Sequence, residues 1–134
     1  MIVDFVIDGE PVAKGRPRFT TTGRTYTPKR TADYEKRVRQ AYNGEMFPED
    51  IPLSVHINAY MGIPKSASKK VREDMRKGFK RPLKKPDGDN IAKAICDALN
   101  GKAYVDDKQV VRLTVEKWYS DYPRAEVRIR EVKE

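Results

Sequence analysis

The chain has 134 residues, with 28 Lys and Arg against 20 Asp and Glu, and it contains one Cys and one His. This length fits one domain, residues 1–134, and the lone Cys96 and lone His56 exclude an internal disulfide and the usual structural zinc site. No apolar run approaches the ~20 residues of a membrane span and no basic export signal is seen, so we expect no membrane contact and a cytoplasmic protein.

The first third of the chain predicts a strand, a loop and a helix. Apolar residues alternate with mostly polar ones over residues 3–7, which is typical of a half-buried strand. Residues 14–24 contain two glycines and a proline without an apolar period, which predicts a loop. Thr27 and Pro28 are suited to be the N-cap and first residue of a helix that ends near residue 43.

The middle of the chain predicts one strand and two helices. Apolar residues alternate over residues 53–61, where His56 falls on the polar face and is expected to be a surface or hydrogen-bonded residue. Ser68 is suited to cap a short basic helix that ends near residue 77. Residues 91–99 have an apolar stripe with helical spacing, which predicts the clearest helix of the chain.

Two further strands are predicted near the C-terminus. Residues 111–115 and 125–129 alternate between apolar and polar, and the turn-forming residues between them predict a hairpin. Strands at both ends, with two or three helices between them, predict an α+β domain built on a mixed or antiparallel sheet.

Positive charge is concentrated in two segments. Residues 11–39 contain nine Lys or Arg against two acidic residues, and residues 64–85 contain ten against two, so the rest of the chain is net negative. Such segregation is typical of a protein that binds a polyanion, whereas solvated loop charge is the alternative. The cations expected to contact DNA are Lys14, Arg16, Arg18, Arg24, Lys84 and Lys85.

The acidic remainder contains two short clusters. Asp87 and Asp89 form the first, and Asp106 and Asp107 form the second. Clustered carboxylates repel a phosphate backbone unless a divalent cation lies between them. Mg²⁺, or Mn²⁺ as the alternative, needs only one or two protein carboxylates besides water and phosphate oxygens. Together with the basic segments, the clusters predict a metal-dependent enzyme that acts on nucleic acid.

The helical spacing adds a lysine to this site. Asp89 and Lys93 are four residues apart, opposite the apolar stripe, so both are expected to face outward. Asp87 precedes the first turn, and Asp107 or Asp106 would complete the metal site, with Lys93 stabilising the scissile phosphate or orienting water. The alternative is structural: helix caps, an ordinary ion pair between positions i and i+4, and a plain turn.

Two segments resemble the signature of the RusA family of Holliday junction resolvases, a group often carried by bacteriophages and prophages. Residues 85–101 contain D-x-D-N, a lysine and D-A-L-N-G in the family's order, and residues 105–110 contain D-D-x-Q-V. The basic stretch at residues 11–18 is also similar to the family's N-terminal segment. The resemblance covers nearly the whole chain and is weakest from about residue 45 to 82.

This resemblance implies a dimeric, Mg²⁺-dependent endonuclease that makes paired nicks in four-way DNA junctions during recombination and repair. The family's metal-binding aspartates and its essential lysine fall on Asp87, Asp89, Asp107 and Lys93. Asp106 and Asn90 are auxiliary positions. Two alternatives stay open: a DNA-binding module without chemistry, and a metal-dependent nuclease that acts on another branched DNA or on RNA.

Overall fold

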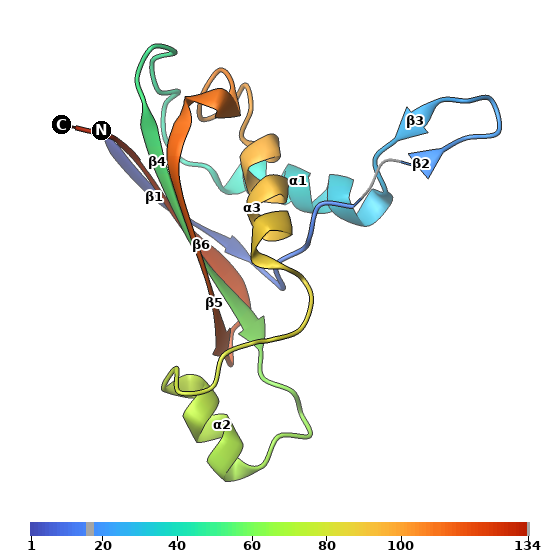
Figure 1. The fold of residues 1–134 in the computed structure, drawn as a ribbon, viewed down its shortest axis with the longest axis vertical. Helices are drawn as coiled ribbons and strands as arrows, with labels where there is room; N and C mark the ends of the chain where they lie inside the picture. The colour runs from blue at the N-terminus through green and yellow to red at the C-terminus, as the bar shows by residue number, and fades with distance from the viewer. Residues whose placement is uncertain (16–17, 134) are drawn as a thin grey trace.

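The main sheet has four strands in the order β1-β6-β4-β5 (Figure 1). The computed structural model describes residues 1–15 and 18–133. The strands are β1 (Ile2–Asp8), β4 (Leu53–Gly62), β5 (Val110–Ser120) and β6 (Arg124–Glu131). β4 is parallel to β5 and antiparallel to β6, and β6 is antiparallel to β1. The sheet is therefore mixed, and the predicted α+β class is confirmed.

The three helices are α1 (Lys29–Ala41), α2 (Lys69–Arg76) and α3 (Gly88–Ala98). α1 and α3 lie on one face of the sheet, whereas α2 lies beyond one end of it (Figure 1). The core lies between the sheet and these two helices, where Tyr34 of α1 and Ile95 of α3 are fully buried. Among the described residues, no helix has both the length and the apolar composition that crossing a membrane requires.

The predicted helices are confirmed, and their ends lie within about three residues of the predicted ones. Ser68 caps α2 as expected, because its side chain accepts a hydrogen bond from the backbone N–H of Val71. α1 differs slightly from its prediction: Pro28, rather than Thr27, is the N-cap residue, and no side chain caps the helix.

The predicted C-terminal hairpin is wrong in its pairing. Both strands form, but β4 lies between β5 and β6 and pairs with each of them. Residues 121–123 connect the two strands past the end of β4 at Gly62, where an added Cβ would lie 3.3 Å from Cγ of Pro123. Strands two positions apart are separated by ~10 Å, which three extended residues can span. Alternation therefore predicted the strands but not their partners.

The stretch predicted as a loop contains a short β-ribbon. β2 (Arg18–Phe19) pairs antiparallel with β3 (Thr25–Tyr26), and Gly23 in the turn has a φ of 84°, a conformation that favours glycine. This ribbon projects away from the sheet and helices (Figure 1). Arg24 is exposed in it, whereas Arg16, another predicted DNA contact, lies outside the described residues.

Candidate active site

α3 presents polar side chains on the side that faces away from the core. Ile91 and Ile95 are fully buried, while Asp89 and Lys93 are exposed. The predicted outward orientation of this pair is therefore confirmed. Among the described residues, three ion pairs span four positions of a helix, and Asp89 with Lys93 is not one of them. The structural alternative, in which these two residues neutralise each other, does not describe this helix.

The turn that contains the second acidic cluster is fixed by a buried glutamine. Gln109 donates through Nε2 to the carbonyl oxygens of Pro48 at 2.8 Å and Ile51 at 3.2 Å. Its Oε1 accepts a hydrogen bond from the backbone N–H of Val105 at 3.1 Å. Because a buried amide needs partners for both its donor and its acceptor, this network stabilises one conformation of the turn.

A buried tyrosine connects the same turn to α3. The hydroxyl of Tyr104 donates to the backbone carbonyl of Cys96 at 2.7 Å, and the Tyr104 side chain is fully buried. Burial in this apolar environment raises the pKa of the Tyr104 hydroxyl, so it stays protonated and remains a donor. The two segments with the predicted chemistry are therefore joined through the core.

The two aspartates of the turn have different surroundings. Asp106 accepts a hydrogen bond from the backbone N–H of Lys108 at 2.8 Å, which caps the short 3₁₀ helix η1 (Asp107–Gln109) and lowers the pKa of the Asp106 carboxyl. Asp107 instead lines a cavity that faces α3. Asp107, rather than Asp106, is therefore the aspartate of this turn that lies beside α3, and its choice as the metal ligand stays a prediction.

One cavity of about 310 Å³ brings the predicted residues of both segments together. Asp89 and Lys93 line it from α3, Asp107 lines it from the turn, and Leu113 of β5 forms part of its wall. These side chains meet because α3 packs on β5, directly after the turn. Two of the three predicted metal ligands and the predicted lysine are thus neighbours in space.

Asp107 is in an environment that disfavours its negative charge. Its pKa is raised, first because burial penalises the charged carboxylate, and then because Asp106 and Asp97 place further negative charge beside it. A divalent cation in this cavity would relieve that repulsion.

Asp97 is a cavity residue that sequence analysis did not select. Its carboxylate lies 3.5 Å from Nζ of Lys14, and the same ammonium group donates to Glu35 at 3.0 Å. The helical spacing could have identified Asp97, since it follows Lys93 by four residues and therefore lies on the same polar face of the helix as Asp89 and Lys93. Lys14, predicted to contact DNA, has its charge held between two carboxylates of the protein.

Asp87 lines a neighbouring groove and not this cavity. It is the N-cap residue of α3, but its side chain makes no capping hydrogen bond and is exposed. The groove has a volume of about 860 Å³ and is also lined by Lys85, Asn90 and Arg30. The backbone N–H of Lys14 donates to the carbonyl of Asn90 at 3.1 Å. This bond holds residues 11–15, most of which also line the groove, against the start of α3.

The donor set fits Mg²⁺ only in part. Asp89 and Asp107 supply two carboxylates to one cavity, and Mg²⁺ usually takes one or two from the protein and completes its shell with water and phosphate oxygens. Within residues 1–15 and 18–133, however, no three Asp, Glu, His or Cys side chains are grouped closely enough to hold a metal ion together. The predicted site of three carboxylates is therefore not assembled in this chain on its own.

The cations of the basic segments divide into two groups. Some have partners within the protein: Arg39 donates to the carbonyls of Ala98 and Asn100 at 3.0 and 2.9 Å, and Arg76 pairs with Asp121 at 2.7 Å. Others are exposed and form no ion pair with an acidic side chain within the described residues. The second group includes Arg24, Arg30, Lys80, Lys84 and Lys85. These cations are available to a polyanion.

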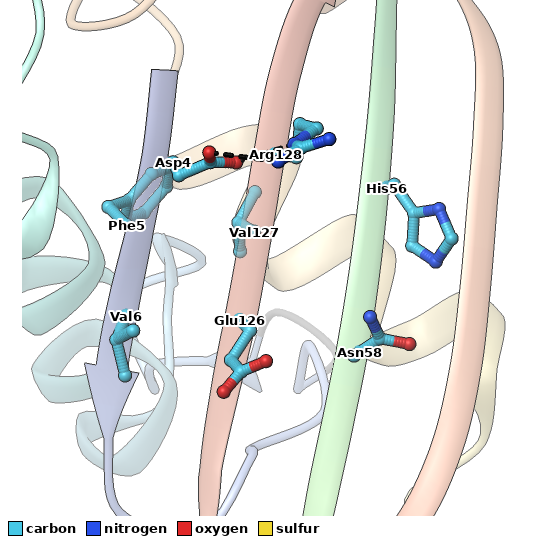
Figure 2. A pocket seen from close by; sticks show the side chains of 8 residues that line it. All are labelled: Asp4, Phe5, Val6, His56, Asn58, Glu126, Val127 and Arg128. Atoms are coloured by element: carbon cyan, nitrogen blue, oxygen red, sulfur yellow. Dashed lines mark hydrogen bonds and ion pairs between the residues drawn. The ribbon is translucent and has the colours of Figure 1, made fainter. Parts of the chain in front are cut away.

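The open face of the sheet has a cavity of about 430 Å³ (Figure 2). Two of its charged side chains pair with each other, since Arg128 donates to both carboxylate oxygens of Asp4 at 2.7 and 3.1 Å. His56 lies on this face, as predicted, with Nε2 3.3 Å from Glu116 but outside hydrogen-bond geometry. These pairings make this cavity a weaker candidate than the one beside α3.

Two comparisons with known proteins give matches over nearly the whole chain. Residues 8–130 match the family model for endodeoxyribonuclease RusA. The chain is also 43% identical over 137 residues to the uncharacterized protein YqaN of Bacillus subtilis (strain 168), and the match covers 97% of this chain and 96% of that protein. The family match spans both acidic clusters and both basic segments.

Proposed function

We propose that this chain, which belongs to the RusA endodeoxyribonuclease family, is a Holliday junction resolvase. In this proposal it makes paired nicks in four-way DNA junctions during recombination and repair, and it acts in the cytoplasm. Family membership makes the chain a DNA endonuclease, a hydrolase of phosphodiester bonds. The observation that supports the assignment of its active site is the convergence of Asp89, Lys93 and Asp107 on one cavity.

Each side chain has a distinct role in this proposal. Asp89 and Asp107 hold a divalent cation, Mg²⁺ or alternatively Mn²⁺, and Asp87 of the neighbouring groove is the third proposed ligand. Such an ion, when bound, polarises the scissile phosphate and makes a nearby water a stronger nucleophile. Lys93 places a positive charge where negative charge develops on the phosphate. Asp106 acts indirectly, by capping the turn that positions Asp107.

The groove beside Asp87 is the proposed path of the DNA strand. Arg30 and Lys85 flank it, and both are exposed. Arg24 on the β-ribbon and Lys84 on the approach to α3 extend the cationic surface beyond the groove. Phosphate contacts of this kind position a duplex without reading its sequence, and they weaken as salt rises.

A cleavage panel tests this function. The substrates are a four-way junction, the matching duplex, a flapped DNA and an RNA, each incubated with Mg²⁺ or with EDTA. We expect symmetric nicks in the junction with Mg²⁺ and none with EDTA. Full turnover in EDTA would exclude a metal-dependent mechanism. Binding without cutting under every condition would favour a DNA-binding module, and preferential cutting of RNA or flaps would assign another substrate.

We expect the active enzyme to be a two-fold dimer. A four-way junction has approximate two-fold symmetry, and its resolution needs two nicks, so two copies of one active site match the substrate. Light scattering should report about twice the chain mass of 15.4 kDa. Dimers formed from wild-type and Asp89→Asn chains should nick mostly one strand. A monomer that makes symmetric paired cuts, or a mixed dimer that cuts both strands normally, would contradict this expectation.

A further inference from the structure

Two large apolar side chains are exposed on the basic loop, which we define as residues 77–86 between α2 and α3. Phe79 is 78% exposed and Leu83 is 97% exposed. Single exposed apolar residues are common on protein surfaces, so exposure alone does not indicate a partner. Three further features of this loop indicate that the two residues contact a partner: its anchoring to the sheet, its charge and its distance from the active site.

The basic loop is fixed to the edge of the sheet. The guanidinium of Arg81 stacks on the ring of Trp118, 3.4 Å from the ring centroid, and its Nε donates to the backbone carbonyl of Lys117. Nζ of Lys117 donates in return to the carbonyl of Lys84 at 2.7 Å. Pro82, between these anchors, is buried. Because the loop is held on β5 by the side chain of Arg81 and by the backbone carbonyl of Lys84, Leu83 is exposed between two anchored residues.

The charge of the basic loop selects the kind of partner. Residues 77–86 contain five Lys or Arg and no Asp or Glu. Lys80, Lys84 and Lys85 are exposed and are not paired with an acidic side chain of the described chain. Apolar side chains among unpaired cations match nucleic acid, in which apolar base faces lie beside phosphates. Phe and Leu are also residues that proteins insert between bases at kinks.

The basic loop is close enough to the proposed cut to contact nearby bases. Leu83 is four residues from Asp87, so the two are at most ~14 Å apart. A strand of DNA advances ~3.4 Å per nucleotide, so this reach corresponds to about four nucleotides. The anchor at Lys117 is likewise four residues along β5 from Leu113 of the cavity wall, or ~13 Å.

From these observations we infer that Phe79 and Leu83 contact unstacked bases at the branch of the junction while the active site holds the scissile phosphate. The inference rests on the proposed junction substrate and assigns its recognition to two residues. In a continuous duplex every base is stacked on its neighbours, and opening a step costs free energy. At a branch the stacking is interrupted, so apolar side chains can replace the missing neighbour at lower cost. The basic loop thereby favours branched DNA over duplex.

The test compares Phe79→Ala and Leu83→Ala with Ile2→Ala as the matched control. Ile2 is 61% exposed on β1, at the opposite edge of the sheet from β5. Affinity for a four-way junction and for duplex is measured with Ca²⁺ in place of Mg²⁺, and 2-aminopurine at the branch reports unstacking. Each loop variant should lose about five- to tenfold in junction affinity, as expected for one lost stacking contact, and less than twofold for duplex.

The remaining outcomes separate this inference from the proposed function. Phe79→Trp should keep wild-type junction affinity, because a larger ring also stacks. Loop variants with unchanged junction affinity and unchanged 2-aminopurine fluorescence would overturn the inference, as would an equal loss for junction and duplex. If the wild-type protein cuts no junction, the proposed function fails, while binding and fluorescence still decide whether these side chains contact branch bases.

Discussion

Replacing Asp89 or Asp107 by Asn is expected to reduce junction cleavage with Mg²⁺ by about a thousandfold, since the loss of one negative ligand removes several kcal/mol of transition-state stabilisation. Asn nearly preserves the shape of Asp, and Asp89 is exposed, so folding should be unaffected. Junction binding should be equal or tighter, because fewer carboxylates repel phosphate in the absence of metal. Initial cleavage rates, thermal unfolding and binding with Ca²⁺ measure the three quantities. Asp87→Asn should give the same result if the groove aspartate also holds the ion.

Asp106→Asn is the matched control for Asp107→Asn. Asp106 caps the turn through its side chain, and Asn is as good a cap as Asp. This variant should therefore keep the turn and most of the cleavage rate. Asp4→Asn on the open face of the sheet is a second control, because its exposed ion pair with Arg128 contributes little to stability. Near-normal cleavage by Asp107→Asn, or loss of its fold, would count against a catalytic role for Asp107.

Lys93→Ala is expected to lower the cleavage rate by at least about a hundredfold, which is typical of losing one group that stabilises developing negative charge. The concentration of metal that supports half-maximal cleavage should change little, since the proposed partner of Lys93 is the phosphate. Because Lys93 is exposed and forms no helical ion pair with Asp89, the free energy of unfolding should change by less than about 0.5 kcal/mol.

Lys102→Ala provides the control for lost charge near the end of α3, since Lys102 is also exposed. It should cleave at close to the wild-type rate. Single-turnover cleavage distinguishes a loss of chemistry from a loss of binding, and thermal melts exclude unfolding. Normal turnover by the Lys93→Ala variant would assign this lysine to the solvated surface of α3 and would leave the cavity without a cation for the phosphate.

The sequence by itself determined most of the secondary structure elements and which side chains of α3 face outward. The apolar stripe of α3 follows the 3.6-residue period of a helix, so burial of Ile91 and Ile95 forces Asp89 and Lys93 to face outward together. The cap at Ser68 and the alternating strands are likewise encoded in residues that are close in sequence. The clustered carboxylates alone predicted a bound metal ion, and the basic segments alone predicted a polyanionic substrate.

Only the tertiary structure decided which segments become neighbours. β4 lies between β5 and β6, so the expected hairpin does not form. Contacts of Gln109 with Pro48 and of Tyr104 with Cys96 of α3 fix the turn so that Asp107 lies beside α3, while Asp106 caps the turn. Asp97 joins the cavity, Lys14 is held by two carboxylates, and Asp87 lines the adjacent groove. Such arrangements depend on long-range packing between elements, whereas periodicity records only which face of each element is buried.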